Sequence, residues 1–416
     1  MRTELVSKNT QKADPWWEVG YEEVISPTVE PMDGQSLSLV HEIISRIGLV
    51  SSGPSAQRKI QILVSSLIYQ SYRLQRKLDQ GKADKLIIGW PHNKDYWIEK
   101  GTVGHKIAKD VRESLIKLGW LTLEANAKVD LYTGEGVCTG YSVSPEVASY
   151  QIRVRTTEFK KSIRGLKSGH IDQEEDERIR RLWSAWDKHP LFFEGHQFTR
   201  AYRKYSNYER KRGGRFYGPW TTLRPDDRLK STIDGEVVAE VDVRAMNLTL
   251  LASYSGLMPK PMTRSFDDPY DCGMHNHRDQ IKAYFMEAIG SGNPQKNQVG
   301  RQLKALGTTN DQLRVLNKVI RPAYPCLTAL KKNHVDSEFF AFHEAEIMLR
   351  ATEQIDLPMY ILHDCMICKT SHAVQVADAI RKAFYGYVEN LGWYPLRPAI
   401  KVSFTDGSTV RSGSRA

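Results

Sequence analysis

Two lone aspartates inside apolar segments constrain the fold of this 416-residue chain more than any other feature. Asp242 follows the β-branched run EVVAEV, and Asp364 lies at the centre of PMYILHDCMICKTS. Apolar runs of this kind, bounded by polar residues, are typical of buried strands. An ionised carboxylate is costly to bury unless it is paired or bound to a metal, so the two aspartates indicate a shared divalent ion if their strands belong to one sheet.

The two carboxylates predict a site for divalent cations. Mg²⁺ and Mn²⁺ prefer oxygen ligands and retain waters and substrate phosphates in their shells, so Asp242 and Asp364 can suffice as protein ligands. Two such ions, about 4 Å apart, would activate an attacking hydroxyl and stabilise a leaving pyrophosphate. The alternative is that each aspartate has a purely structural role.

A pair of cations lies between these strands, in the segment HNHRDQIKAYFMEAIGSGN. Arg278 and Lys282 are four residues apart, which places them on one face of the predicted helix, one turn from each other. Cations so placed can hold a triphosphate beside the metal ions, where charge moves during phosphoryl transfer. An ordinary helix surface is the alternative.

The N-terminal part predicts an irregular arm and then helices. Residues 1–35 carry Pro15, Pro27 and Pro31 among polar residues, and apolar residues recur every three or four positions over 36–80. A charged and aromatic region follows further on, over 149–212, and predicts a helical basic linker or thumb-like region with helices near 173–188 and 195–212.

A helix and a hairpin are expected over residues 100–145. The helix ends at Gly119, a strand begins at Trp120, and a glycine-rich turn from Thr133 to Thr139 leads into a second strand. The apolar stripe of the helix comprises Ile107, Val111, Leu115 and Leu118.

This arrangement resembles a winged helix-turn-helix domain, which would span residues 36–148. The resemblance implies a recognition helix that enters the major groove of DNA. Its basic face comprises Lys106, Lys109 and Arg112. The alternatives are a protein-interaction module and a packing unit with a solvated charged face.

Basic residues and tyrosines alternate near the end of the 149–212 region. Basic side chains neutralise phosphates and aromatic faces stack on bases, so this run predicts a nucleic-acid-binding surface. Its candidate contacts are Arg203, Lys204, Arg210, Lys211 and Arg212, interleaved with Tyr202, Tyr205 and Tyr208. A solvated helix face is the alternative.

The charge balance agrees with a polyanionic partner. The chain has 59 Lys+Arg against 49 Asp+Glu, a net charge of +10, which favours nucleic acid. No stretch approaches the roughly 18 apolar residues of a membrane span, and the first residues lack an apolar signal core. Five scattered cysteines form no disulfide framework. We therefore expect a cytoplasmic protein with no membrane partner.

The second half resembles family A DNA polymerases and bacteriophage-type single-subunit RNA polymerases. The stretch GGRFYG is similar to the GR-containing segment before their first catalytic motif, EVDVRAMNLTLLA resembles motif A, RDQIK the start of motif B, and YILHDCMIC motif C. The four segments follow the families' order. The resemblance implies an α+β fold, with a polymerase-like palm of antiparallel sheet and helices and with fingers, over residues 213–416.

The resemblance also implies roles for individual residues. Asp242 and Asp364 would be catalytic metal ligands, and Arg278 and Lys282 would bind the incoming triphosphate. Other substrate contacts would be Arg215, His363 and Asn247.

Several positions depart from the families' motifs. Cys365 follows the motif C aspartate where the DNA polymerases have Glu and the RNA polymerases Ser, and Gly290-Ser291 replaces the Tyr-Gly of motif B. Asn247 stands where the DNA enzymes have Glu and the RNA enzymes Gly, so the choice of sugar stays open. The short separation of Asp242 and Asp364 implies reduced fingers.

Two classes of function remain open from the sequence. The first is a template-directed nucleotidyltransferase, with a DNA polymerase of phage, plasmid or mobile-element replication favoured over an RNA polymerase or primase. Its partners would be a DNA template-primer, nucleoside triphosphates and replication proteins. The second is a non-catalytic DNA-binding replication initiator or regulator. His343 either faces the nucleotide site or is an ordinary helix histidine.

Overall fold

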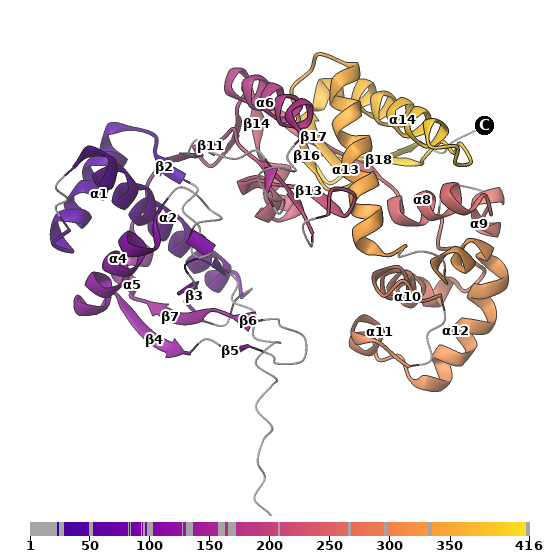
Figure 1. The fold of residues 1–416 in the computed structure, drawn as a ribbon, viewed down its shortest axis with the longest axis horizontal. Coiled ribbons are helices and arrows are strands. Elements are labelled where there is room, and N and C mark those ends of the chain that lie inside the picture. Colours follow the sequence, from indigo (N-terminus) through magenta and orange to yellow (C-terminus); the bar gives the residue numbers. More distant parts are fainter. Residues whose placement is uncertain are drawn as a thin grey trace, which may run out of the picture. The chain divides into compact units, whose positions relative to one another are not determined.

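The chain divides into two compact units, residues 1–160 and 161–416 (Figure 1). The computed structural model describes residues 23–24, 29–49, 53–81, 83, 85–92, 94, 96–97, 103–126, 128–129, 136–156, 163–164, 172–206, 209–264, 268–294, 298–331 and 335–412. Both units combine helices with sheets, so the predicted α+β class is confirmed. The finer predicted boundaries, at 36, 149 and 213, stay predictions.

The first unit contains four helices and a small mixed sheet among its described residues. The helices are α1 (Gly34–Arg46), α2 (Pro54–Asp79), α4 (His105–Lys117) and α5 (Pro145–Ser149). The strands are β1 (Glu23–Val24), β2 (Val29–Pro31), β3 (Ile87–Trp90), β4 (Leu121–Ala125), β5 (Lys128–Val129), β6 (Gly136–Val137), β7 (Thr139–Val143) and β8 (Val154–Thr156). The sheet has the order β1-β3-β7-β4, and β2 pairs with β8.

Helices α1 and α2 confirm the helical prediction for residues 36–80. The arm predicted over 1–35 is not irregular throughout, because β1 and β2 are strands. The rest of that arm before β2, residues 1–22 and 25–28, lies outside the described residues.

Helix α4 ends as its sequence predicts. Gly119 takes φ = 69°, and the Trp120 amide donates a 2.9 Å hydrogen bond to the carbonyl of Leu115, as in a Schellman cap. Strands β4 and β7 then pair in antiparallel. The predicted stripe was wrong at its last position, since Leu118 is 44% exposed and Ala108 is buried instead.

The second unit carries most of the strands and the longest described stretch of the chain. Its helices are α6 (Gln173–Lys188), α7 (Pro225–Arg228), α8 (Met246–Ser255), α9 (Lys260–Arg264), α10 (Arg278–Gly290), α11 (Arg301–Ala305), α12 (Asn310–Ala323), α13 (Ser337–Gln354) and α14 (Ala373–Asn390). Its strands are β9 (Ile163–Arg164), β10 (Leu191–Phe193), β11 (His196–Phe198), β12 (Tyr202–Tyr205), β13 (Gly213–Tyr217), β14 (Thr232–Ile233), β15 (Glu236–Val243), β16 (Met359–Leu362), β17 (Cys365–Lys369), β18 (Ile400–Ser403) and β19 (Thr409–Ser412).

Strand β15 lies at the centre of the main sheet. It pairs in antiparallel with β17 along one side and with β14 and then β18 along the other, while β16 and β19 extend the sheet outward. Helices α13 and α14 pack against each other and against these strands, and Figure 1 shows α10, α11 and α12 gathered away from the sheet.

An aromatic cluster holds the outer strand β16. The indole N–H groups of Trp186 and Trp220 donate hydrogen bonds of 2.8 and 2.9 Å to the carbonyls of Met359 and Ile361. Both indoles also pack against Tyr360, with ring centroids 5.1 and 4.9 Å away. The outward carbonyls of this edge strand are therefore satisfied by side chains.

The helix predicted near 173–188 is confirmed as α6, but the helix predicted near 195–212 is wrong. That segment forms β11 and β12, and β12 pairs with β13 in antiparallel. The alternation of buried and more exposed residues over Tyr202–Tyr205 has the period of a strand. Charge density in the run masked this period of two.

A glycine bulge shapes the β12–β13 hairpin. The pairing register shifts after Lys204 and Arg215, and Gly214 is the extra residue, with φ = 81°. Its carbonyl accepts a 2.7 Å hydrogen bond from Nε of Arg203, and a Cβ at this position would lie 3.0 Å from Nη2 of the same arginine. Backbone conformation and lack of space both favour glycine here.

Candidate active site

The two aspartates meet at one end of the main sheet. Asp242 lies on β15 directly opposite Cys365 of β17 and Lys401 of β18. Asp364 belongs to the loop between β16 and β17, and its backbone carbonyl accepts a 3.0 Å hydrogen bond from the Val243 amide. The segments of both aspartates thus belong to one sheet, but the single strand expected around Asp364 is wrong: it is a hairpin of β16 and β17 with Asp364 in its turn.

Positive φ angles lie close to both aspartates. Four non-glycine residues in the described chain have positive φ: Glu194, Asp234, Ala245 and His363. Glu194, Asp234 and His363 each begin a two-residue hairpin turn, where such angles are ordinary, although Asp364 follows His363 where a glycine follows the other two. Ala245 comes three residues after Asp242, directly before α8, and it is the one of the four outside such a turn.

Burial and mutual repulsion disfavour two negative charges here. Burial raises the pKa of Asp242 to about 7, the charge of Asp364 adds to this rise, and Lys401 and Lys282 oppose it. Burial also raises the pKa of Asp364, against the effects of its backbone hydrogen bond, Arg215 and Lys282. A divalent cation between the carboxylates would relieve both effects, so this oxygen donor set fits Mg²⁺ or Mn²⁺.

The carboxylates would need further ligands from water or phosphate. Within the described residues, no group of three or more His, Cys, Asp or Glu side chains is placed to hold a metal ion. Cys365 and Cys368 are buried free thiols of β17, and burial raises the pKa of both. This agrees with a packing role for the cysteines.

A buried carboxylate that the sequence prediction missed lies beside the pair. Glu344 of α13 has a side chain that is 1% exposed, and it accepts two hydrogen bonds of 2.8 Å from Nε and Nη2 of Arg215. Burial raises its pKa to about 7, Asp364 adds to the rise and Arg215 lowers it. The one signal for Glu344 in the sequence is that the residues three and four positions away, Phe340, Ala341, Ile347 and Met348, are all apolar.

The predicted triphosphate pair begins α10, and its two members differ. Lys282 is exposed, and its charge lowers the pKa of both Asp242 and Asp364. Arg278 forms an ion pair with Asp268 through Nε and through Nη2 at 3.2 Å. Lys282 thus acts on the aspartates through its charge, whereas Arg278 is held by a carboxylate of its own.

Two further predicted contacts carry buried polar atoms that no hydrogen bond satisfies in the structure. These atoms are Oδ1 of Asn247, in the first turn of α8, and Nδ1 of His363. Burial lowers the pKa of His363 to about 4, with further lowering by Arg215 and Arg228. Both atoms thus lack the partner that a buried polar atom ordinarily has, and the imidazole of His363 is neutral near pH 7.

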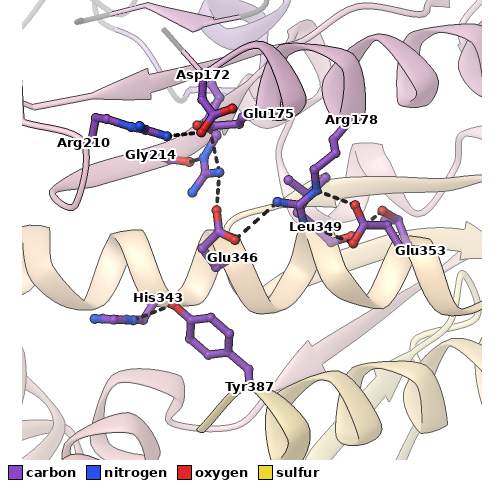
Figure 2. A network of polar contacts seen from close by, with 12 residues as sticks. Asp172, Glu175, Arg178, Arg210, Gly214, His343, Glu346, Leu349, Glu353 and Tyr387 are labelled. Carbon is purple, nitrogen blue, oxygen red and sulfur yellow. Dashed lines mark hydrogen bonds and ion pairs between the residues drawn. The ribbon is translucent and has the colours of Figure 1, made fainter. Parts of the chain in front are cut away.

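His343 is a satisfied helix histidine, one of the two alternatives left open by the sequence. Its Nδ1 lies 2.7 Å from the hydroxyl of Tyr387 (Figure 2), and burial lowers its pKa to about 4.

One member of the predicted basic surface is turned inward. Arg203 is fully buried, with ion pairs of 2.8 and 2.5 Å to Glu175 and Glu346, so its prediction as a nucleic-acid contact is wrong. Figure 2 shows Glu346 reaching from α13 to Arg178 as well, at 3.5 Å. The physical reason is strand alternation, which sends every second residue of β12 into the interior.

The two remaining arginines of that surface are ion-paired, although Arg210 is also exposed, and its two lysines are exposed. Arg210 binds Asp172 at 2.5 Å (Figure 2), and Arg212 binds Asp336. Lys204 and Lys211 are exposed.

The basic face predicted on α4 is narrower than expected. Lys106 and Lys109 are exposed, but the side chain of Arg112 is only 12% exposed and lies 3.7 Å from Glu113. Arg112 follows Lys106 by six residues, and at about 100° per residue this places Arg112 about 120° from Lys106 around the helix axis. Arg112 has thereby rotated toward the buried side, so it does not share one exposed face with the two lysines.

Comparisons with known proteins give a likeness to solved structures. None of the helices in the described part of the chain has the length and apolar character that a membrane crossing requires. No family model matches the sequence, and no curated protein matches it. Among solved structures, the chain is similar to the POL domain of Pol1 from M. smegmatis in complex with DNA primer-template and dNTP, with 11% sequence identity and a TM-score of 0.34 over 89% of this chain and 72% of that chain.

Proposed function

We propose that the second unit is the catalytic part of a template-directed nucleotidyltransferase, a DNA polymerase acting in phage, plasmid or mobile-element replication. The observation that carries the proposal is the meeting of Asp242, on β15, with Asp364, in the β16–β17 loop, among the charges of Lys282, Lys401 and Arg215. Two like charges buried side by side are costly, and a cation-dependent reaction gives them a use.

Asp242 and Asp364 are the residues that would hold two Mg²⁺ or Mn²⁺ ions. When bound, the ions would lower the pKa of a primer hydroxyl and neutralise charge on the leaving pyrophosphate. Both carboxylates would be ionised in this state. The main sheet would hold them in place. The rigid pairing of β15, β17 and β18 fits this demand, because it leaves the carboxylates little freedom.

The cations around the aspartates would bind and orient the triphosphate. Lys282 would contact its phosphates, and Arg278 would do so after exchanging Asp268 for phosphate oxygens. Asn247 and His363 would offer hydrogen bonds to the nucleotide through the polar atoms that now lack partners. The preference for deoxyribose or ribose would depend on whether Asn247 excludes the 2′-hydroxyl of the nucleotide.

The first unit would bind DNA as a winged-helix-like module. Helix α4 would be the recognition helix, with Lys106 and Lys109 as its phosphate or base contacts, and the β4–β7 hairpin would be the wing.

A non-catalytic replication initiator is the second candidate. The ion pair between Asp268 and Arg278 favours it, because a triphosphate-binding arginine would have to leave a partner first. A neutral residue, Cys365, also follows Asp364.

Primer extension tests the proposal. Purified protein is given a primed or unprimed DNA template, Mg²⁺, and either dNTPs or rNTPs. We expect extension of the primed template with dNTPs, and its loss in Asp242→Ala and in Asp364→Ala. If the wild-type protein binds DNA but incorporates neither kind of nucleotide, the polymerase proposal fails and the initiator proposal takes its place.

A further inference from the structure

The β12–β13 hairpin has two faces of opposite character. Residues directly opposite each other in an antiparallel pair share a face, so Tyr202 lies beside Tyr217 and Lys204 beside Arg215. The other face is buried and carries Arg203, Tyr205 and Phe216. The first face, defined by Tyr202, Lys204, Arg215 and Tyr217, is the hairpin platform.

Aromatic rings run along this platform to the catalytic loop. The rings of Tyr202 and Tyr217 are stacked, with centroids 5.8 Å apart and planes 22° from parallel. Tyr217 then meets the ring of His363 edge-on at 6.1 Å. The guanidinium of Arg164 covers Tyr202 at 3.7 Å from its centroid. Tyr217 is 38% exposed, so it is the ring that a ligand can reach.

Positive charge accompanies the rings. Lys204 is exposed, and Arg215 is 33% exposed along its side chain, although Glu344 fixes its guanidinium. Arg215 also lowers the pKa of Asp364, the neighbour of His363. The platform thus combines an accessible aromatic ring, an exposed cation and an anchored cation within reach of the aspartates.

We propose that the hairpin platform binds single-stranded nucleic acid and leads that strand to Asp242 and Asp364. A ring with an open face accepts an unstacked base, which a duplex does not offer, and cations beside the ring match the adjacent phosphates. Tyr217 stacks on a base near the end of the strand, and Lys204 binds its phosphates. This inference deepens the proposed function and rests on it for the direction of the strand.

Oligonucleotide binding without catalysis tests the platform. The full-length protein is titrated into fluorescein-labelled oligo(dT) in EDTA, and anisotropy is followed at several salt concentrations. We expect Tyr217→Ala to weaken binding by roughly ten-fold or more, as loss of one stacking contact does. The salt slope, which is the slope of log affinity against log salt concentration, should stay unchanged. Tyr217→Phe keeps the ring and should stay within about two-fold of wild type. Lys204→Ala should lower the salt slope by about 0.7.

Helix α14 supplies matched controls. Tyr385 is 37% exposed and Lys382 is exposed on the same helix. Tyr385→Ala and Lys382→Ala should bind as wild type. Thermal unfolding of each variant identifies any that fail to fold, and Tyr217→Phe and Lys204→Ala keep the test decisive if Tyr217→Ala is one of them.

The outcomes separate this inference from the proposed function. If wild type extends primers while Tyr217→Ala and Lys204→Ala bind oligo(dT) normally, the platform is wrong and the polymerase stands. If the variants lose binding while wild type incorporates no nucleotide, the platform stands without the polymerase. Equal weakening in the α14 controls would also overturn the platform.

Discussion

The guanidinium of Arg215 donates two parallel hydrogen bonds of 2.8 Å to the carboxylate of Glu344. A bidentate pair of this kind fixes the plane of the guanidinium as well as its position. Glu344 is buried and Arg215 is only partly so, which makes the glutamate the fixed member. Helix α13 therefore places a cation at the edge of the Asp242–Asp364 site.

Removal of this anchor should change the metal requirement. In Glu344→Gln the charge of Arg215 is free to turn toward Asp364, and one nearby negative charge is lost, so both effects weaken cation binding. We expect several-fold more Mg²⁺ for half-maximal thermal stabilisation, and for half-maximal extension if the protein is a polymerase. Glu353→Gln, on the exposed end of the same helix, is the matched control.

Neutralising one aspartate should stabilise the metal-free protein at high pH. The pKa of Asp242 is raised to about 7 in the folded state from a usual value of 3.8, so the folded state binds more protons between these limits. The stability that protonated Asp242 contributes is therefore fully present below about pH 4, and it is lost as the pH rises through about 7.

In Asp242→Asn this slope is absent. We expect a gain of roughly 1–2 kcal/mol at about pH 8 in EDTA, equivalent to a few degrees in melting temperature, and little difference near pH 4. Scanning calorimetry across this range measures it. A variant less stable than wild type at every pH would show that the carboxylate has a stabilising partner.

Mg²⁺ should stabilise wild type and not the variants. A cation that binds the folded state alone adds about 2.7 kcal/mol at a concentration 100 times its dissociation constant. Protons compete for the same oxygens, so the shift should shrink below about pH 7. Melting temperatures of wild type, Asp242→Asn and Asp364→Asn, with Mg²⁺ or EDTA, check this. Equal shifts of the melting temperature in all three proteins would show that the ion binds at another site.

Arg203 should matter for stability and not for nucleic acid. Arg203→Met leaves Glu175 without its buried counter-charge and Glu346 with Arg178 in place of two arginines, and breaking a buried pair typically costs about 3–5 kcal/mol. Urea unfolding measures the loss, and Lys211→Ala, an exposed change nearby, should cost less than about 0.5 kcal/mol. Oligonucleotide binding by the folded fraction of Arg203→Met should equal that of wild type.

The bulge glycine should resist substitution. Gly214→Ala puts a side chain at φ = 81° and 3.0 Å from Arg203, so we expect a loss of roughly 1–3 kcal/mol. Gly290→Ala, at the end of α10 with nothing within 4 Å of the new Cβ, should be neutral or slightly stabilising. Equal unfolding curves for the two variants would contradict the strain.

The sequence predicted the local elements best where period and punctuation agree. The limits of α6, the stop at Gly119 and the strand of Asp242 all appear in the structure, whereas the segment around Asp364 forms a hairpin in place of one strand. Apolar period and capping glycines act over a few residues, so one sequence contains them in full.

The failures have a common physical cause, which is tertiary packing. The run through Arg203 was interpreted by its charge, and only the pairing of β12 with β13 shows which of its cations face inward. Glu344 and Lys401 were missed because their proximity to the aspartates depends on α13 and β18, which lie far from Asp242 in sequence. Partners brought together by folding leave no short-range pattern.

The loop between β16 and β17 limits how the chain can change in length. Leu362 pairs with Cys365, so His363 and Asp364 make up the whole connection. One inserted residue there would have to be absorbed by a new loop or by a slipped strand, and a slip by one residue turns every side chain to the opposite face. Single substitutions leave the length of this loop unchanged and keep the strand register, but we expect the loop to tolerate neither insertions nor deletions.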